Sequence, residues 1–375
     1  MAITDYTAAR LSQGIATLYA GKAAIAQLVT EENKVLVDDV NRAGTVVKDF
    51  VPLADGSVTA LTRNTSETAS GSQNIIPVTF SMLEYGKGTD AVVFPWKEFM
   101  IRAEAPGAYM KIVESLANKA ITAADKLGAA VVRDAIGAGT NAAYVHPLGP
   151  DDQGGGVMGF TSPTASKLVR YGTQSTTRAN RAAITTADVA TWDWVQSMAM
   201  TLNERNCRPV ANLGGSPIMA LIAHGHLIND LLKSLSQTSV YSNLLANTGM
   251  AQRLGEQGIG ASLVGLYDGA LIIRSDRMVY AAAGSGSINV YPMVMVGGDF
   301  LAKAALSPAA LPQIPSDGDL YSVGDGSCVI VQPDYSGVHS NRLGTCSWYG
   351  YLGYGVYDPY AYVRVECAST SAGRL

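Results

Sequence analysis

The chain has 375 residues, of which 47% are hydrophobic and 15% are charged, and its formal net charge is −4. This length predicts two domains or one elongated domain, and the small negative charge excludes a broad basic surface for binding nucleic acid. The charged fraction is low for a protein that covers its own surface with charge. We therefore expect part of the exterior to be buried against partners, or to be rich in Ser, Thr, Gly and Asn.

The sequence shows no signal for export or membrane insertion. Residues 1–22 lack the basic and apolar regions of a secretory signal, and no window approaches 18 uninterrupted apolar residues. The cysteines lack metal-binding spacing, which favours free thiols in a reducing cytosol over disulfides or a zinc site. They are Cys207, Cys328, Cys346 and Cys367.

The first hundred residues predict an arm followed by a long hairpin. Residues 1–32 have apolar residues at near-helical intervals and read as a weakly amphipathic arm. The stretches VLVDD, TVVKDFVPLAD and PVTFSMLEYG then alternate apolar and polar residues as strands do. Between the last two lies the polar stretch VTALTRNTSETASGSQN. A hairpin with so polar a tip has little core of its own, so we expect it to lie on something external.

A long helix made largely of small residues is predicted next. Pro106 and Gly107 favour a helix start, and Gly137 and Gly139 favour its end. A rod of about 30 residues would be roughly 45 Å long. Its stripe of small side chains would allow a sheet or another helix to approach closely. The stripe residues at intervals of three and four are Ile112, Leu116, Ala120, Ala123, Ala124, Leu127, Val131 and Ala135.

The remaining chain predicts mixed helices and strands without a regular alternation. A loop-rich span covers residues 141–181, and a second helix follows, with Thr185 and Asp188 as its capping box. The run SPIMALIAHG predicts a buried strand and HLINDLLKSL a short helix. Two strand pairs are predicted in LVGLYDGALIIRSDRMVYA and INVYPMVMVGGDFLAKAAL, and a long aromatic strand pair would turn near Asp358 and Pro359. The predicted class is α+β.

No motif in the sequence predicts catalysis or cofactor binding. His224 and His226, with Asp230 one turn on, could bind a metal, but a strand-end His-Gly-His more often forms a turn. Asp317-Gly318-Asp319 opens like a calcium loop and fails at Tyr321 and Ser322. The GxSxG and phosphate-loop motifs are absent. We therefore expect no enzyme, no cofactor and no metal, and a protein whose work is association.

Five stretches in the expected order resemble one protein family. They are FVPLADGS, PVTFSMLEYGKGTDAVVF, IGAGTNAAYV, INVYPMVMVGGDF and NRLGTCSWYGYLGYGVYDPYAYVRVECAS. Together they resemble the major capsid proteins of tailed bacteriophages, within them the family around the coliphage N-four capsid protein. The resemblance implies an α+β fold with an N-arm, an extended E-loop hairpin, a long spine helix, a P-domain and an A-domain.

The resemblance also implies a division of the chain and a set of assembly contacts. The parts would be the N-arm at 1–32, the E-loop hairpin with flanking P-domain strands at 33–100, the spine helix and P-domain with a loop-rich insertion at 101–185, the A-domain at 186–320, and C-terminal P-domain strands at 321–375. Assembly contacts are expected at the E-loop tip and on the spine helix. They are Arg63, Asn64, Thr65, Ser66 and Glu67 at the tip, and Ile112, Leu116, Ala120, Leu127 and Val131 on the helix.

Gly86, Gly88, Gly137 and Gly139 would be hinges or plain turns. Some relatives crosslink a hairpin lysine to a neighbour, but the tip at 62–74 has no lysine, so we expect no such bond. No role is assigned to residues 160–181.

The implied partners are copies of the chain itself, as hexamers and pentamers of an icosahedral shell. Portal and decoration proteins would join them, with separate scaffolding or none, and packaged double-stranded DNA would be contacted without sequence recognition. Assembly would take place in the host cytoplasm, without a membrane, and the product would be the virion capsid. Two alternatives stay open from the sequence: an encapsulin-type compartment that encloses enzymes, and an unrelated enzyme or binding module.

Overall fold

The computed structural model describes the strands of the first hundred residues, the long helix, and most of the chain between residues 169 and 370. The described residues are 31–32, 36–37, 46–52, 75–81, 83–85, 92–95, 106–134, 169–173, 175–204, 207–213, 216–234, 263–267, 269–298, 300–305, 319–324, 327–333, 343–356 and 361–370.

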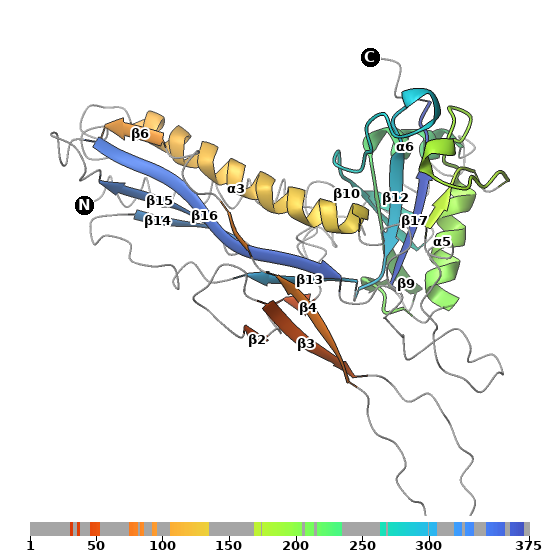
Figure 1. Cartoon of the computed structure of the whole chain (residues 1–375), viewed down its shortest axis with the longest axis horizontal. Helices are drawn as coiled ribbons and strands as arrows, with labels where there is room; N and C mark the ends of the chain where they lie inside the picture. The colour runs from red at the N-terminus through yellow and green to blue at the C-terminus, as the bar shows by residue number, and fades with distance from the viewer. Residues whose placement is uncertain are drawn as a thin grey trace, which may run out of the picture.

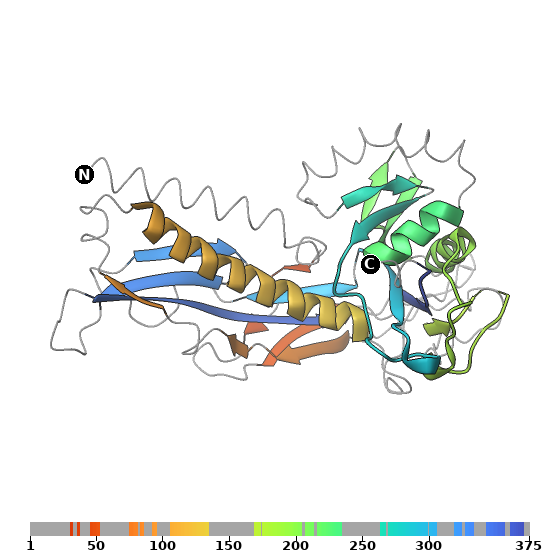
Figure 2. The ribbon, with the colours of Figure 1, turned by 90° about the horizontal axis from the view of Figure 1, so that it is seen from above.

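One long helix joins two sheets. The helix α3 (Pro106–Asp134) runs along one sheet and ends against another (Figures 1 and 2). The long sheet has the order β1-β13-β16-β15-β14, with β5 and β6 also paired to β16. Its strands are β1 (Glu31–Glu32), β5 (Leu83–Tyr85), β6 (Val92–Pro95), β13 (Leu301–Ala305), β14 (Asp319–Gly324), β15 (Ser327–Pro333) and β16 (Leu343–Val356).

The second sheet is compact and carries the other helices. Its order is β10-β11-β9-β12-β17-β7, and β8 pairs with β9. Two α-helices, α5 (Trp192–Glu204) and α6 (Gly225–Ser234), pack on it, and two short 3-10 turns are η3 (Arg181–Ala183) and η4 (Ser285–Ser287). Its strands are β7 (Val169–Tyr171), β8 (Ala211–Leu213), β9 (Ser216–Ala223), β10 (Leu263–Tyr267), β11 (Ala270–Arg274), β12 (Tyr291–Val296) and β17 (Tyr362–Cys367).

The predicted hairpin is confirmed as a third, separate ladder. Strand β3 (Val46–Pro52) pairs antiparallel with β4 (Ile75–Ser81), and β2 (Leu36–Val37) pairs with β3. Among the described strands, these three pair only with one another. Residues 53–74 lie outside the described part, and the predicted tip from Arg63 to Glu67 lies with them.

The long helix starts at Pro106, as predicted, and its 29 residues give a rod of about 44 Å. Its small and branched residues face the long sheet, where Leu116 and Ala120 belong to one core with Trp348. The helix ends at Asp134, three residues before the first glycine expected to stop it. Proline at the first helical position fits because its missing N–H has no intrahelical partner there.

Two of the predicted strand pairs are wrong. Strands β12 and β13 do not pair with each other, because β12 lies in the second sheet and β13 in the long sheet. Strands β16 and β17 are divided in the same way. Each connection that looks like a hairpin turn is therefore a crossover between sheets, which places β13 in the long sheet and β17 in the second.

The β12–β13 crossover is held by the backbone around it. The N–H of Gly298 donates to the carbonyl of Arg208 over 2.7 Å, and the N–H of Gly297 donates to that of Ala361 over 2.9 Å. A Cβ on Gly298 would stand 2.7 Å from the carbonyl oxygen of Pro209. Both positions therefore need glycine for close backbone approach.

The second helix starts later than predicted. It begins at Trp192, and Thr185 and Asp188 lie in the loop before it. The N–H of Thr185 does donate to the carboxylate of Asp188, as in a capping box, but Val189 then forms a bridge with Ala368 beside β17. The capping pattern is real, and it closes a turn of the loop instead of a helix.

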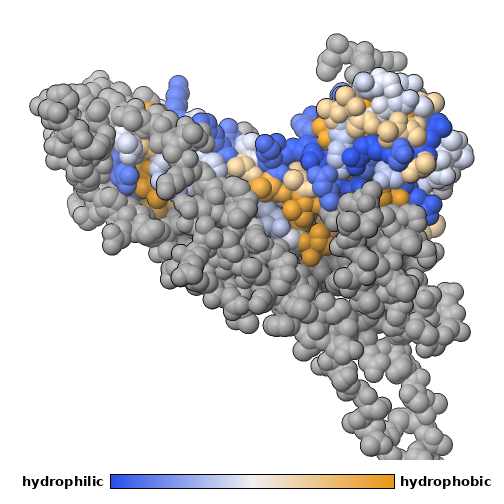
Figure 3. All heavy atoms as spheres, in the orientation of Figure 1, coloured by the Kyte–Doolittle hydropathy of each residue, from blue (hydrophilic) through white to orange (hydrophobic). Residues whose placement is uncertain are grey.

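The described surface is less apolar than the composition suggests. Its only exposed large hydrophobic residues are Met200, at 63%, and Leu320, at 37%. Figure 3 shows mainly hydrophilic and intermediate residues over the second sheet, with hydrophobic residues toward the middle of the molecule. None of the described helices is long and apolar enough to cross a membrane.

Candidate functional site at the end of the long helix

Side chains from the second sheet cap the C-terminal end of α3. The last carbonyls of a helix have no partner within the helix. Here the hydroxyl of Tyr362 donates to the carbonyl of Val132 over 3.0 Å, and the guanidinium of Arg364 donates to the carbonyl of Arg133. Both donors stand on β17, so this strand fixes the helix end directly.

Tyr280 forms a second link to the same helix end. Its hydroxyl lies 2.9 Å from the carbonyl oxygen of Arg133 and 2.7 Å from the Asp134 carboxylate, and it has one proton for the two. Burial raises the pKa of Tyr280, so the hydroxyl stays protonated and remains a donor. Burial works against the charge of Asp134, but hydrogen bonds from Arg133 and Tyr280 outweigh it and lower the pKa of this carboxyl group.

A buried carboxylate connects two arginines behind the helix end. Glu366 is fully buried, and one of its oxygens lies 3.0 Å from the Nε atom of Arg364. Arg181 donates to both oxygens of Glu366, over 2.6 and 2.8 Å. Such two-pronged contacts are strong and directional. Because Arg364 is also buried, each of these charges depends on its partner to remain in the interior.

Arg181 also packs on an aromatic ring. Its guanidinium carbon lies 3.4 Å from the centroid of the Tyr280 ring, and that of Arg133 lies 5.1 Å away. These distances allow cation–π attraction. We call the whole cluster the joint. Its members are Arg133, Asp134, Arg181, Tyr280, Arg364 and Glu366.

The charges of the joint suit the end of a helix. Three arginines face two carboxylates, which leaves one positive charge in excess. The C-terminal end of a helix carries about half a negative charge. The excess positive charge of the joint therefore lies where the dipole of α3 favours it. The joint binds this helix end through hydrogen bonds to the last carbonyls and through attraction to the dipole.

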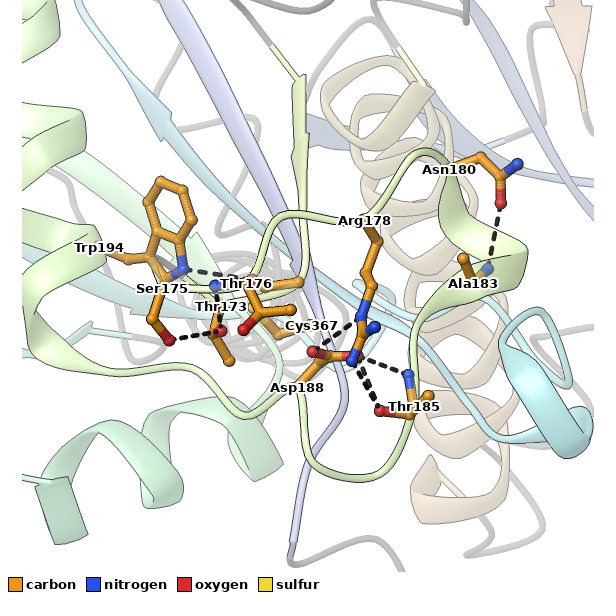
Figure 4. Close-up of polar contacts among 11 residues, drawn as sticks. Thr173, Ser175, Thr176, Arg178, Asn180, Ala183, Thr185, Asp188, Trp194 and Cys367 are labelled. Atoms are coloured by element: carbon orange, nitrogen blue, oxygen red, sulfur yellow. Dashed lines mark hydrogen bonds and ion pairs between the residues drawn. The ribbon is translucent and has the colours of Figure 1, made fainter.

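Arg181 stands on a loop with its own internal order, shown in Figure 4. Residues 172–191, described except for residue 174, are called the strap here. Arg178 donates to both carboxylate oxygens of Asp188 over 3.2 and 2.9 Å, and the hydroxyl of Thr185 donates to the same group over 2.9 Å. Burial opposes the Asp188 charge, yet these bonds lower its pKa. The side chain of Asn180 accepts from the N–H of Ala183 over 3.1 Å and caps η3.

Both ends of the strap are fixed to the second sheet. The N–H of Gly172 donates to the Glu366 carbonyl over 2.9 Å, and the N–H of Ala368 donates to the Asp188 carbonyl over 2.7 Å. The indole N–H of Trp194 donates to the Gly172 carbonyl over 3.2 Å. Gly172 has φ of 89°, which favours glycine at this turn. The strap is thus held against the second sheet by hydrogen bonds near both of its ends.

The contacts of the joint connect the end of α3 to the second sheet. The described residues contain no group of three metal-binding side chains. Each titratable group in the joint is engaged with another or with the helix end. The arrangement can hold the helix at a fixed angle to the second sheet, and it can transmit force between them.

The predicted helix residues divide into two groups in the structure. Leu116 and Ala120 are buried in the core that α3 forms with the long sheet. Ile112, Leu127 and Val131 are partly buried and pack against the same core. The predicted tip residues and the glycines Gly86, Gly88, Gly137 and Gly139 lie outside the described residues. None of the five predicted assembly residues on α3, the described part of that set, belongs to the joint.

The other candidates from the sequence are committed elsewhere. Asp230 accepts hydrogen bonds from the hydroxyls of Ser369 and Thr370, both over 2.6 Å. Among the described residues, no metal-binding group joins it to His224 and His226. The Asp319 carboxylate accepts from the Tyr109 hydroxyl over 3.3 Å. The cysteines are free thiols, as predicted, and three of the four are buried: Cys328, Cys346 and Cys367.

Sequence reasoning missed the joint, although a signal was present. In the run YVRVEC, Arg364 and Glu366 interrupt a strand whose six residues are all buried. Two charges at positions i and i+2 lie on the same face of a strand, and charges in a buried strand must be paired. Arg181 carried no such signal, because its partner is 185 positions away.

Comparison with solved structures finds the same fold in phage capsids. No family model and no curated protein matches the chain. A chain of the capsid of Ralstonia phage GP4 superimposes with a TM-score of 0.58 at 13% identity, covering 92% of this chain and 88% of that one. A chain from the cyanophage A-1(L) capsid gives 0.54 at 12%, covering 92% of each.

A chain from the mature capsid of bacteriophage PhiM1 gives a TM-score of 0.50 at 14% identity, covering 91% of this chain and 86% of that chain. The predicted α+β fold of tailed-phage capsid proteins is therefore confirmed, over nearly the whole length of the chain.

Proposed function

We propose that the chain is the major capsid protein of a tailed bacteriophage, a structural protein that forms the icosahedral shell around the double-stranded DNA genome. One observation carries the proposal: the fold matches phage capsid chains over about 90% of both chains, with TM-scores from 0.50 to 0.58. Because identity is only 12–14%, the likeness lies in the fold, and function is an inference from it.

The proposed assembly uses each part of the fold against a neighbour. The second sheet would serve as the A-domain around the centres of hexamers and pentamers, and α3 and the long sheet as the spine and P-domain. The hairpin β3–β4 would serve as the E-loop and lie on the next copy. Its three strands pair with no other described strand, although β4 also contacts β16. This supports the role, because a short ladder is marginal in water without further packing. Head-to-tail contacts of this kind close into rings.

The proposed partners follow from the enclosed genome and the shell. The inner surface would contact DNA without recognising sequence, and a net charge of −4 suits weak contact. Portal, scaffolding and decoration proteins would bind the shell, which would be assembled in the host cytoplasm and end in the virion.

Electron microscopy of the purified chain tests this function. The full chain is expressed, purified and examined by negative stain at several protein and salt concentrations, and nuclease-resistant DNA and co-purifying proteins are measured in the same particles. We expect closed shells of uniform size. A monomer of 39.2 kDa under all these conditions contradicts the proposal, and shells that hold a protein cargo in place of DNA favour an encapsulin-type compartment.

A matched pair of variants tests the hairpin contact. Replacing residues 63–67 of the proposed tip with glycine and serine should leave the subunit folded and prevent shell formation. The control is Met200→Ala, which removes an exposed side chain from α5 and should assemble normally. Circular dichroism checks folding of both, so that failure to assemble is distinguished from failure to fold.

A further inference from the structure

We propose that the strap, residues 172–191, positions the second sheet on the end of α3, and that Arg181 is the positioning residue whose release loosens this connection without unfolding either part. The inference concerns the angle between α3 and the second sheet. Only its consequence for the shell rests on the proposed function.

Arg181 is the contact through which the strap reaches the joint. It donates to both oxygens of Glu366 over 2.6 and 2.8 Å and stacks on Tyr280 at 3.4 Å. Tyr280 in turn bonds to the last residues of α3. A lysine could not reproduce the two-pronged contact and the stacking together, because it lacks the planar fork of arginine.

The strap would stay folded when this contact opens. Arg178, Thr185 and Asp188 form a cluster inside the strap that does not involve Arg181. The strap is also anchored at both ends by backbone hydrogen bonds, through Gly172 and Asp188. Its fold and its contact with the joint are therefore separable.

The joint itself would survive the loss of Arg181. The side chain of Arg181 is 32% exposed, whereas that of Arg364 is 2% exposed. Without Arg181, Glu366 still faces Arg364 at 3.0 Å, so its charge keeps one partner. Arg181 is thus the outer, replaceable member of the cluster, and Arg364 is the inner one on which the helix end depends.

The consequence for a shell is geometric. In the proposed function, every copy repeats the same angle between α3 and the second sheet, and this angle contributes to the curvature of the shell. An engaged strap would give one angle, and a released strap would allow a range of angles. Particles built from strap-released subunits should therefore vary more in diameter.

Hydrogen–deuterium exchange on the full-length, unassembled chain tests the inference. In Arg181→Ala, we expect exchange at residues 128–134 and 172–191 to rise about tenfold or more, the factor that accompanies loss of a pair of charge-assisted hydrogen bonds. Exchange in β9 and β12 should not change. Arg181→Lys should give a smaller rise at the same residues, because it keeps the charge opposite Glu366.

The control is Arg274→Ala, which removes an exposed arginine that pairs with Asp276, with side-chain exposures of 58% and 66%; its exchange should match the wild type throughout. Unchanged exchange in Arg181→Ala overturns the inference. A rise spread over β9, β12 and α5 also overturns it, since that result marks general destabilisation. If Arg181→Ala does not fold, Arg181→Lys carries the same comparison.

Failure of this inference is distinguishable from failure of the proposed function. The exchange experiment uses subunits before assembly and does not require a shell. Particle diameters are then measured separately for wild-type and Arg181→Ala shells, where a broader distribution is expected in the variant. If local exchange rises but the variant shells are as uniform as the wild type, the strap positions the second sheet within the subunit, and its role in shell curvature is contradicted.

Discussion

The long helix meets its two sheets by opposite means. Along most of its length, α3 packs on the long sheet through small and branched apolar residues such as Ala117, Ala120 and Leu116, all at most 1% exposed. At its C-terminal end it meets the second sheet through arginines, tyrosines and carboxylates.

The two contacts should respond differently to change. Apolar packing is non-directional, and its loss scales with the volume removed. The joint is directional, and removing its inner carboxylate, Glu366, leaves buried partners unpaired. The contact of α3 with the long sheet should therefore tolerate small changes in shape. The contact of its C-terminal end with the second sheet should be sensitive to the loss of single polar atoms and charges.

The largest effect is expected from Glu366→Ala. Glu366 is fully buried between Arg364 and Arg181, and its removal leaves two arginines without their carboxylate. Breaking a buried ionic contact in this way costs about 3–5 kcal/mol. Urea unfolding followed by tryptophan fluorescence measures it, and a loss below about 1 kcal/mol would show that the joint contributes little.

A comparable or smaller loss is expected from Leu116→Ala on the apolar side. Leu116 is 1% exposed, and truncating a core leucine costs about 2–5 kcal/mol. Met200→Ala, at an exposed site, should change stability by less than about 0.5 kcal/mol. Equal effects of the two substitutions in urea unfolding would mean that α3 is not packed as the structure shows.

A crossover between the sheets should also be sensitive. Gly298→Ala places a Cβ 2.7 Å from the carbonyl oxygen of Pro209, and overpacking of this kind costs about 1–3 kcal/mol. Gly107→Ala is the matched control, because nothing lies within 4 Å of its added Cβ. It should stabilise the helix by up to about 1 kcal/mol. Thermal unfolding of both variants checks the opposite signs.

The smallest effect is expected from protonation of His224 at low pH, at a site away from the joint. Burial lowers the pKa of His224, and nearby His226 and Arg274 add to this while Asp276 opposes it. The neutral ring also accepts the His226 backbone N–H at Nδ1 over 3.1 Å. The pKa of His224 in the folded chain is below its unfolded value of about 6.5. The stability that neutral His224 contributes is therefore fully present above pH 6.5 and is lost as the pH falls through the folded pKa.

His224→Asn should flatten this pH dependence, since an amide oxygen can accept the same hydrogen bond without titrating. Melting temperatures between neutral and mildly acidic pH measure the difference. An identical slope in the variant and the wild type would assign the acid effect to other groups.

Local patterns predicted elements better than partners. The start of α3 at Pro106, the β3–β4 hairpin and the β9–α6 unit all follow from signals within a few residues, such as proline placement and alternation. Alternation cannot tell which strand will lie alongside. The glycines between β12 and β13 therefore looked like a turn, although the chain crosses there to another sheet.

The joint escaped prediction for the same reason. Arg181 and Glu366 are 185 positions apart, and no local pattern links them. The capping residues Thr185 and Asp188 interact as predicted, but the helix that their pattern predicts begins only at Trp192. The contact of Asp188 with Arg178 and the bridge of Val189 with Ala368 decided the outcome.

Crosslinking between differently labelled copies tests the central proposal most directly. Chains grown on light and heavy nitrogen are mixed, assembled and treated with a lysine-reactive crosslinker, which can join Lys48 on β3 to the exposed Lys111 on α3. The proposed shell predicts that peptides linking the hairpin to α3 carry mixed isotopes, because the hairpin lies on a neighbouring copy. Hairpin crosslinks found only within single copies, on a chain that stays monomeric, would contradict it.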